Sequence, residues 1–531
     1  MYKMLGIIAV FSIIPRMKTH DNFSEISKEE LINLLREKNT LVTQQAKQIQ
    51  FLEEQILAYQ LRQFAAKSEK MNPNQASLFD EAEPPKSEEK ILSQEEEITV
   101  ASYKRKNKAG RKPLPAELLR VPRVYDLSEE EKTCSCGCAL THIKDEKSEQ
   151  LEIIPAKIYV IEHVRKKYAC KGCQTTIKLA SQPLAPIPRS IAASGLLSHV
   201  LVSKFQDHLP LHRQETILKR IGVDIPRATL SLWVIKCAEL LFPLLKLMHD
   251  RILTYDVAYA DETTLQVLKE PNKGVQSKKY MWLFAGGPPE EFVYYYRYHP
   301  SRSHEVAVNF FEDFAGFIHC DGYAAYDSLA NKSPGITLVG CLYHARRKFV
   351  EVAKLMPNKE GVATYVINCI AKLANIEEEI KDLILPEKQL ARFNSAKPLL
   401  DDLQQYLISN QPTIPPKSLL GQAVSYTLNQ WSKILNYLKD PRLDISNNLS
   451  ERAIKPFVIG RKGWLFANSV DGANAAATIF SIIETCKYHK VEPYDYLRYV
   501  LNALPQCQTI DDYEKLLPYK IDRSLLMASV N

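Results

Sequence analysis

The sequence lacks a convincing secretory signal. Its N-terminal apolar run, from Leu5 to Ile14, is too short to span a bilayer. The residues that follow, Ile14-Pro-Arg-Met, do not form the small-residue site at which signal peptides are cleaved. A polar, amphipathic sequence begins at Met17. We therefore interpret Met17 as the translation start and expect a cytoplasmic protein without a membrane partner.

The sequence also lacks a strong excess of charge of either sign. Its 69 Lys and Arg residues against 62 Asp and Glu residues give a net charge of +7, which does not by itself identify a nucleic-acid partner. Hydrophobic residues make up 45% and charged residues 25% of the chain, as in ordinary soluble globular proteins. A chain of 531 residues is too long for one hydrophobic core, so we expect several domains.

The sequence also lacks the even number of cysteines that a framework of paired disulfides needs. The eleven cysteines are an odd number, and five of them lie between Cys134 and Cys173. In a chain without a secretory signal, the pair Cys170-Lys-Gly-Cys indicates metal binding and not a disulfide framework.

A second group of cysteines, Cys134-Ser-Cys-Gly-Cys, precedes a stretch of alternating polar and apolar residues. Two thiolate pairs joined by strands predict a structural Zn²⁺ site, which would stabilise a module too small for its own core. The first pair is either Cys134 with Cys136, or a pair in which Cys138 replaces one of them. The nearby His142 and His163 are more typical of ordinary surface or core positions than of ligands.

Proline and glycine are missing from residues 27 to 63. Apolar residues recur there at every seventh position: Leu35, Val42, Ile49 and Ile56. The companion positions are mixed: Leu31 and Leu52 are apolar, Lys38 and Gln45 polar. The pattern predicts a helix that either self-associates as a coiled coil, giving a homo-oligomer, or packs alone on its own domain.

The sign of the charge changes between residues 80 and 112. Residues 80–97 hold eight acids, two lysines and two prolines without periodicity, which predicts a disordered linker. Six positive charges then follow from Lys104 to Lys112 without an intervening acid. The run Gly110-Arg-Lys-Pro resembles a hook that inserts Arg111 and Lys112 into a narrow minor groove, although a solvated linker has the same composition.

A helix-turn-helix pattern follows the cysteine-rich region. An apolar-periodic helix is expected from Ile191 to Phe205, and a second helix begins at Leu211 and ends at Gly222. Pro226 starts a third helix, which would present Arg227 and Thr229 to DNA from its first turn. Helix pairs without a DNA function are common, so the motif gains weight from its neighbours.

Short β-rich runs appear from Tyr255 onward. The expected strands are Asp256–Tyr259, Lys279–Ala285, Glu291–Tyr298, Gly316–Cys320 and Ile336–Leu342. The expected helical segments are His304–Phe314, His344–Leu355, most of Asn358–Asp440, and a largely amphipathic helix from Ala473 to Leu501. Strands in hairpin order followed by alternating strands and helices match an RNase H-like α/β core.

Three acidic residues have informative surroundings. Asp261 and Asp321 each follow a short apolar run, and Glu451 precedes a basic, aromatic stretch. Carboxylates at strand ends lie where α/β sheets place their sites. Brought together, three of them can hold two divalent cations roughly 3.5–4 Å apart for in-line attack on a phosphodiester. Because 62 acids offer many such triples, structural ion pairs are the alternative.

Four longer sequence blocks carry more information than the acids alone. They are Ala260-Asp-Glu-Thr, Cys320-Asp-Gly-Tyr, His344-Ala-Arg-Arg-Lys-Phe and Asn447-Asn-Leu-Ser-Glu-Arg-Ala-Ile-Lys-Pro-Phe-Val-Ile-Gly-Arg-Lys-Gly-Trp-Leu-Phe-Ala. In this order they resemble the insertion-sequence-66 family of bacterial DDE transposases, and the last block is highly specific. The family usually has Asp-Asn-Asn before the glutamate, whereas this chain has Ser446-Asn-Asn.

The resemblance implies an enzyme that cleaves DNA at the ends of an insertion sequence and transfers the freed strands to target DNA. Its partners would be the double-stranded terminal repeats, target DNA and accessory proteins of the same element. Asp261, Asp321 and Glu451 would be the catalytic ligands of Mg²⁺ or Mn²⁺. The resemblance also favours one set of ligands for Zn²⁺: Cys134, Cys136, Cys170 and Cys173.

The departure at Ser446 leaves an alternative function. If the usual aspartate assists metal binding or hydrogen bonding, its loss would weaken activity. The chain would then be an inactive relative that binds element ends as a regulator or assembly partner. The intact Asp261, Asp321 and Glu451 argue against this, because a relic would be free to lose them.

Two further basic groups accompany the acids. Arg346 and Arg347 follow the last expected strand and would either clamp a phosphate or form a DNA-facing surface. Arg461 and Lys462 lie beside Trp464 and Phe466, a combination that either holds DNA and stacks a splayed base or includes ordinary core aromatics.

These observations predict a multidomain α/β protein. The expected regions are an N-terminal helical region at 17–65, a linker with a basic stretch at 66–120, a zinc-binding module at 121–182, a helix-turn-helix region at 183–245, a catalytic core at 250–470 with a helical insertion at about 358–440, and a C-terminal helical element at 471–531.

Overall fold

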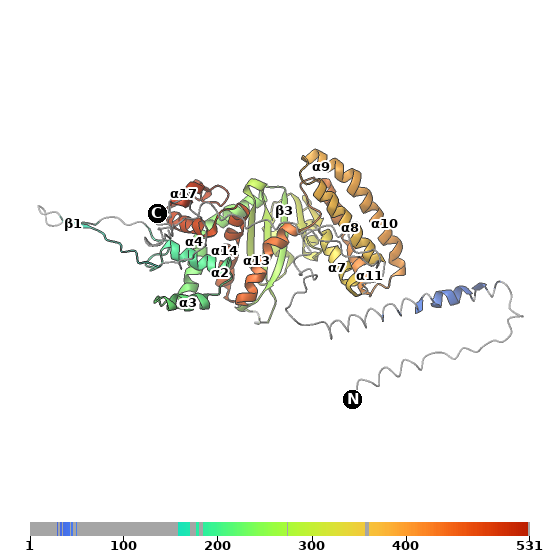
Figure 1. Cartoon of the computed structure of the whole chain (residues 1–531), viewed down its shortest axis with the longest axis horizontal. Coiled ribbons are helices and arrows are strands. Elements are labelled where there is room, and N and C mark those ends of the chain that lie inside the picture. Colours follow the sequence, from blue (N-terminus) through green and yellow to red (C-terminus); the bar gives the residue numbers. More distant parts are fainter. Residues whose placement is uncertain are drawn as a thin grey trace, which may run out of the picture. The chain divides into compact units, whose positions relative to one another are not determined.

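The computed structural model describes residues 158–169, 177–179 and 184–528 apart from 273, 275 and 356–360, together with a series of positions between 29 and 52 (Figure 1). The chain divides into two compact units, one of residues 1–86 and 183–531 and the other of residues 87–182. Several predicted features lie outside the described residues: the translation start, the linker, Arg111, Lys112, Cys134, Cys136, Cys170 and Cys173.

The described positions between 29 and 52 are helical, as the heptad pattern predicts. Leu35, Val42 and Ile49 are exposed there, so coiled-coil pairing stays a prediction. In the smaller unit, β1 (Lys167–Ala169) pairs antiparallel with β2 (Ile177–Leu179), on either side of the second cysteine pair in the sequence.

A five-stranded mixed sheet forms the centre of the larger unit (Figure 1). Its order is β6-β5-β3-β7-β8. β5 (Lys279–Gly286) pairs antiparallel with both β3 (Val257–Leu265) and β6 (Val293–His299). β7 (Gly316–Cys320) is parallel to β3, and β8 (Ile336–Gly340) is parallel to β7. The apolar run from Met281 to Ala285 is fully buried because protein covers both faces of the sheet.

The strands match the predicted runs except at their ends. The sequence predicted that Asp261 follows a strand that ends at Tyr259. In the structure β3 continues through Asp261, so this carboxylate lies inside the strand. The antiparallel neighbour β5 extends β3, because it pairs with β3 as far as Leu265, whereas the parallel pairing with β7 stops at Tyr259. β8 ends at Gly340 and not at Leu342, since Leu342 begins the next helix.

The helix α14 (Val470–Tyr488) covers the edge strand β6. The backbone amides of Tyr294 and Tyr296 donate to the hydroxyls of Thr485 and Ser481 at 3.0 and 2.8 Å. These bonds satisfy amides that an uncovered edge would leave open to another chain.

The C-terminal segment differs from the amphipathic helix predicted over 473–501. α14 is buried on all its faces because it packs between the sheet edge and α4 (Arg227–Leu253). A turn in which Lys490 has a φ of 56° separates it from α15 (Pro493–Ala503). Two short helices follow, α16 (Ile510–Glu514) and α17 (Arg523–Ala528).

The predicted helix-turn-helix corresponds to α3 (Leu211–Arg220) and α4, preceded by α2 (Ser194–Phe205). Gly222, with a φ of 84°, lies in the turn after α3, as its place in the sequence predicts. α4 runs unbroken past residue 245, where the helix-turn-helix region was expected to end. It is long and apolar enough to cross a membrane, but it packs against α14 and β6 as a core helix.

The remaining helices complete the sheet layers and the insertion. Near the sheet are α5 (His304–Phe310), α6 (Ala324–Lys332), α7 (Leu342–Leu355) and α13 (Asn448–Trp464). The insertion contains α8 (Val362–Glu379), α9 (Leu385–Ala391), a π-helical turn (Arg392–Ala396), α10 (Lys397–Asn410), α11 (Leu419–Asn429) and α12 (Trp431–Leu435).

A buried arginine joins the insertion to the segment that leads into α13. Arg392 is 1% exposed and forms an ion pair with Glu377 at 2.6 Å. Its guanidinium also donates to the backbone carbonyls of Tyr437, Asp440 and Leu443 at 3.3, 3.2 and 2.7 Å. One side chain therefore fixes the path of residues 437–443, which precede the predicted catalytic glutamate.

Candidate active site at the edge of the sheet

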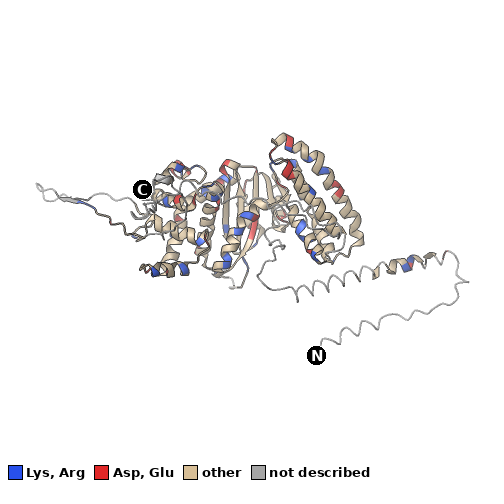
Figure 2. Ribbon diagram, viewed as in Figure 1, with Lys and Arg blue, Asp and Glu red and all other residues tan. Residues whose placement is uncertain are grey.

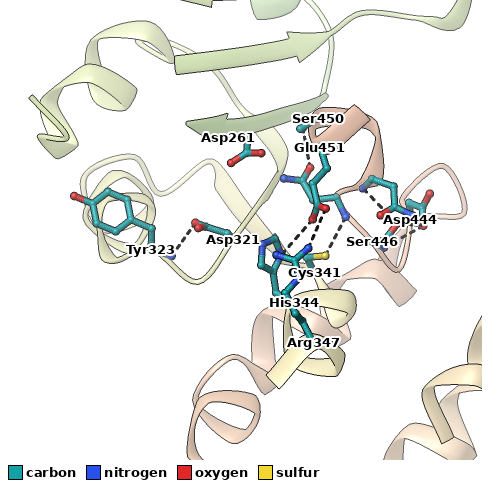
Figure 3. Close-up of polar contacts among 12 residues, drawn as sticks. Asp261, Asp321, Tyr323, Cys341, His344, Arg347, Asp444, Ser446, Ser450 and Glu451 are labelled. Atoms are coloured by element: carbon teal, nitrogen blue, oxygen red, sulfur yellow. Dashed lines mark hydrogen bonds and ion pairs between the residues drawn. The ribbon is translucent and has the colours of Figure 1, made fainter. Parts of the chain in front are cut away.

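The three predicted carboxylates come from three separate elements and lie around one space (Figure 3). Asp261 lies in β3, just beyond Tyr259, which is the last residue of β3 that pairs with β7. Asp321 directly follows the end of β7, and Glu451 lies in the first turn of α13. Parallel pairing of β3 and β7 brings the two aspartates to the same end of the sheet.

Asp261 lies in an electrostatically unfavourable environment for an anion. Burial raises the pKa of its carboxyl group well above the usual value, and the negative charges of Glu262 and Asp321 raise it further. His344 acts in the opposite direction, and the Glu262 amide donates to Asp261 Oδ1 at 2.8 Å. A cation bound among these carboxylates would relieve the repulsion.

The neighbouring Glu262 has partners of its own. Its side chain is 1% exposed, forms an ion pair with Arg302 and accepts a hydrogen bond from the Tyr326 hydroxyl at 2.7 Å. Arg302 Nη2 also lies 3.9 Å from Asp321 Oδ2. Side chains alternate along β3, so the adjacent acids differ: Glu262 has an ion pair and a hydrogen bond, whereas Asp261 has no ion pair to a described residue.

Asp321 is held by the turn that follows β7. Its Oδ1 accepts the amide of Tyr323 at 2.9 Å, an Asx turn that orients the carboxylate. Gly322 is closely covered by the insertion, because a Cβ at this position would lie 2.8 Å from the ring of Tyr426 on α11. The insertion therefore braces this turn.

Glu451 lies between two side chains of α7. Its Oε1 is 3.6 Å from His344 Nδ1, and its Oε2 is 3.4 Å from Arg347 Nη2. Both partners of Glu451 therefore come from another helix, α7. Arg347, predicted to contact DNA, thus lies beside the predicted catalytic glutamate.

Asn447 and Cys341 connect α13 to the sheet, a role that the sequence analysis missed. The Asn447 amide donates to Cys341 Sγ at 3.2 Å, and its side chain donates to the carbonyl of Ala260 at 3.2 Å. Ser450 donates to the Asn447 side chain at 2.8 Å. These bonds join the start of α13, which carries Glu451, to β3 at the residue before Asp261, and the signal for them was the position of Asn447 within the specific last block.

Ser446 is buried and takes part in local hydrogen bonds. Its hydroxyl donates to Asp444 at 3.3 Å and accepts the amide of Asn448 at 3.4 Å, at the start of α13. A short polar side chain that accepts an amide of the first turn stabilises a helix start. An aspartate at this place could accept the same amide, but an ionised carboxylate has no hydrogen to donate to Asp444.

The other predicted DNA contacts lie at three places. Arg227 is exposed and Thr229 partly exposed on the first turn of α4, whose first amide donates to Glu215 at 3.0 Å. Arg346 and Arg347 are partly buried on α7. Figure 2 shows basic and acidic residues interspersed along the described helices.

At the end of α13, Lys462 is exposed, whereas Arg461 bonds to Thr263 and to Thr264 of β3. The two aromatic residues there differ. Trp464 packs against Phe457 with ring centroids 5.5 Å apart, as the core alternative predicted, and Phe466 is 42% exposed.

Comparisons with known proteins agree with the sequence resemblance. The model of the transposase IS66 family matches residues 189–475. The zinc-finger binding domain of transposase IS66 matches residues 131–174, the IS66 C-terminal element residues 481–519, and the transposase C of IS166 homeodomain residues 51–123.

Relatives from Sinorhizobium fredii support the same conclusion. The uncharacterized protein y4jD is 33% identical over 75% of this chain and 80% of its own length. The uncharacterized protein y4qI is 30% identical over 78% of each chain. Together with the order of the matched regions, these similarities show that the chain belongs to the IS66 family of transposases.

Proposed function

We propose that this protein is a DNA transposase that cleaves DNA at the ends of an insertion sequence and joins the freed 3′ ends to target DNA. The observation that carries the proposal is the convergence of Asp261, Asp321 and Glu451 from β3, β7 and α13 in a chain of a transposase family (Figure 3).

The sheet supports an RNase H-like assignment of this core. Three antiparallel strands are followed by two strands parallel to the first of them, in the order β6-β5-β3-β7-β8. The glutamate arrives on a helix after the insertion, so distant parts of the chain supply one site. This arrangement fits the resemblance better than a chance triple of acids does.

The donor atoms fit hard divalent cations. Asp261, Asp321 and Glu451 offer carboxylate oxygens, the ligands that Mg²⁺ and Mn²⁺ prefer. Such ions supply activation of the attacking hydroxyl group and stabilisation of the charge on the leaving oxygen. The chain's own part is to orient its carboxylates through Asn447, the Asx turn and the insertion.

The predicted DNA contacts belong to the same proposal. Binding of double-stranded terminal repeats and target DNA would use Arg227, Thr229, Arg346, Arg347, Arg461 and Lys462, with Arg111 and Lys112 preceding the zinc module. Structural Zn²⁺ would be held by Cys134, Cys136, Cys170 and Cys173. We further propose a cytoplasmic homo-oligomer that acts with accessory proteins of its element.

A strand-cleavage assay on DNA carrying the element's terminal repeats tests the function. With Mg²⁺ or Mn²⁺, the protein is expected to cleave at the 3′ ends, and Asp261→Asn to abolish cleavage. Asp313→Asn is the matched control, because Asp313 is exposed before β7 and its φ of 64° suits asparagine.

Binding to the repeats without cleavage would contradict the catalytic proposal if adding the accessory proteins did not restore activity. That result would favour the inactive regulator suggested by Ser446. The variant Ser446→Asp separates the two further, since a gain of cleavage on this change would show that the missing aspartate limits activity.

A further inference from the structure

Beside the three carboxylates lies a second group of donor atoms of different chemistry. Cys341 Sγ, His344 Nδ1 and a Glu451 carboxylate oxygen all lie within 4.8 Å of one another. Cys341 is the residue between the end of β8 and the start of α7. His344 lies in the first turn of α7, and Glu451 lies in the first turn of α13 (Figure 3).

Two of these donor atoms lack the bonds that burial normally demands. Within the described part of the chain, His344 Nδ1 and Glu451 Oε1 are buried without a hydrogen-bond partner. They lie 3.6 Å apart. Tetrahedral Zn²⁺ with bonds of about 2.0–2.1 Å to nitrogen and oxygen places two ligand atoms roughly 3.4 Å apart. The spacing of this pair therefore already suits a shared cation.

The surroundings of the Cys341 sulfur act on a thiolate in two opposite directions. The backbone amide of Asn447 donates to Cys341 Sγ at 3.2 Å, and the sulfur lies next to the N-terminal end of α7, whose first amides lower the pKa of the thiol. Such outer bonds orient and stabilise a ligating thiolate. Burial and the charge of Glu451 act in the opposite direction and raise the pKa of the free Cys341 thiol to about 12. A cation that binds the sulfur must therefore displace the thiol proton to solvent.

We propose that Cys341, His344 and Glu451 bind a soft divalent cation of the Zn²⁺ type, and that this binding inhibits the proposed cleavage by withdrawing Glu451 from Asp261 and Asp321. Sulfur and imidazole nitrogen favour Zn²⁺, Co²⁺ and Cd²⁺, whereas Mg²⁺ prefers oxygen. Arg347 opposes any cation here, because its guanidinium lies 3.4 Å from Glu451 Oε2. The thiolate and the carboxylate offset that repulsion.

The binding part is tested with Co²⁺ on the full chain whose zinc module is loaded. Wild type should bind one more Co²⁺ than Cys341→Ser, with a thiolate-to-cobalt absorption in the difference spectrum. Cys369→Ser is the matched control, since Cys369 is a buried thiol on α8 outside the cluster. Equal stoichiometry and equal spectra for wild type and Cys341→Ser would overturn the site.

A second variant guards against misfolding of Cys341→Ser. His344→Ala keeps the thiol and should weaken Co²⁺ binding on the order of 10-fold or more. Unchanged Co²⁺ affinity in this variant would also overturn the site.

The inhibitory part rests on the proposed function. At fixed Mg²⁺, Zn²⁺ should inhibit wild type at concentrations about 10-fold or more below those needed for Cys341→Ser, with each protein normalised to its own activity in Mg²⁺ alone. Equal inhibition of both proteins would overturn the inhibitory role. Complete lack of cleavage in Mg²⁺ would instead contradict the proposed function, while the Co²⁺ spectra would still decide the binding.

Discussion

At the scale of single residues, the site shows which acids are satisfied and which are not. Glu262 has an arginine and a tyrosine hydroxyl as partners. Asp261, one residue earlier, has no ion pair to a described residue, and burial with the charges of Glu262 and Asp321 raises its pKa, whereas the raised pKa of Glu262 is partly offset by its two partners. The difference follows from strand alternation. The uncompensated charge belongs to the residue proposed to bind a cation.

Asp261→Asn is therefore expected to stabilise the protein when divalent cations are chelated. A carboxyl group whose pKa is raised on folding contributes stability below its unfolded pKa of about 4, and this stability is lost as the pH rises through the folded pKa. At pH 7 the variant should gain on the order of 1 kcal/mol in the free energy of unfolding.

Thermal unfolding at pH 4 to 8 measures this gain, which should grow as the pH rises. Added Mg²⁺ should raise the melting temperature of wild type more than that of Asp261→Asn. A variant less stable than wild type at pH 7 in chelator would contradict the electrostatic explanation.

A second residue, Leu465, adopts a strained conformation after α13. Its φ is 65° and its ψ is −50°, and the amide of Phe466 donates to the carbonyl of Trp464 at 2.8 Å. A three-residue turn of this kind is rare and strained for a residue other than glycine. The Leu465 side chain is 63% exposed, so packing of this side chain does not offset the backbone strain.

Leu465→Gly is expected to increase the free energy of unfolding by about 1 kcal/mol, because relief of backbone strain exceeds the entropy that glycine loses on folding. Chemical denaturation measures the change. Ile459→Gly is the control of opposite sign: Ile459 is 47% exposed within α13, where glycine should cost about 1 kcal/mol. Destabilisation of both variants alike would show that Leu465 is unstrained.

At the scale of secondary-structure elements, the insertion is a structural support for the site. Tyr426 on α11 covers the turn of Asp321, and Arg392 fixes the segment before α13. Helices inserted between the second and third carboxylates therefore position both of them. The insertion is part of the site's geometry even though it supplies none of the three acids.

Arg392→Met is expected to destabilise the protein by roughly 3–5 kcal/mol, because it removes a buried cation and leaves Glu377 and three carbonyls without their donor. Lys397→Met is the comparison, since Lys397 forms an exposed ion pair with Asp401 on α10 and should cost less than about 1 kcal/mol. Urea unfolding of the two variants checks the difference, and similar small losses would contradict the anchoring role of Arg392.

At the scale of the whole molecule, residues 87–182 form a compact unit that is distinct from the unit carrying the three carboxylates. The family match to a zinc-finger domain lies within that smaller unit, at residues 131–174. A small module of this kind depends on its metal for folding, whereas the larger unit has an extensive apolar core.

Removal of Zn²⁺ with a chelator is therefore expected to expose the smaller unit to protease while the region from 184 to 528 stays resistant. Limited proteolysis followed by mass spectrometry of the fragments measures this. Zinc replacement should restore the protection. Equal protection of residues 121–182 with and without the chelator would contradict a zinc-dependent fold.

Local patterns in the sequence predicted most of the elements of the larger unit. Alternating and apolar runs located β5, β7 and β8 to within a few residues, and Gly222 and Pro226 marked the turn before α4. The specific blocks around Asp261, Asp321 and Glu451 identified the family, which the comparisons confirm. These signals are local, so the sequence carries them without a fold.

Only the tertiary structure decided the relations between distant segments. Pairing with β5 extended β3 through Asp261, and packing against β6 and α4 buried α14 on every face. Likewise, Glu451 meets His344 and Arg347 because the start of α7 lies against the segment before α13, where the Leu342 amide donates to the Ile445 carbonyl at 3.0 Å, although 104 residues separate Arg347 from Glu451. The sequence by itself determined the chemical identity of the donor groups, whereas their mutual distances depend on packing between elements, which local periodicity does not encode.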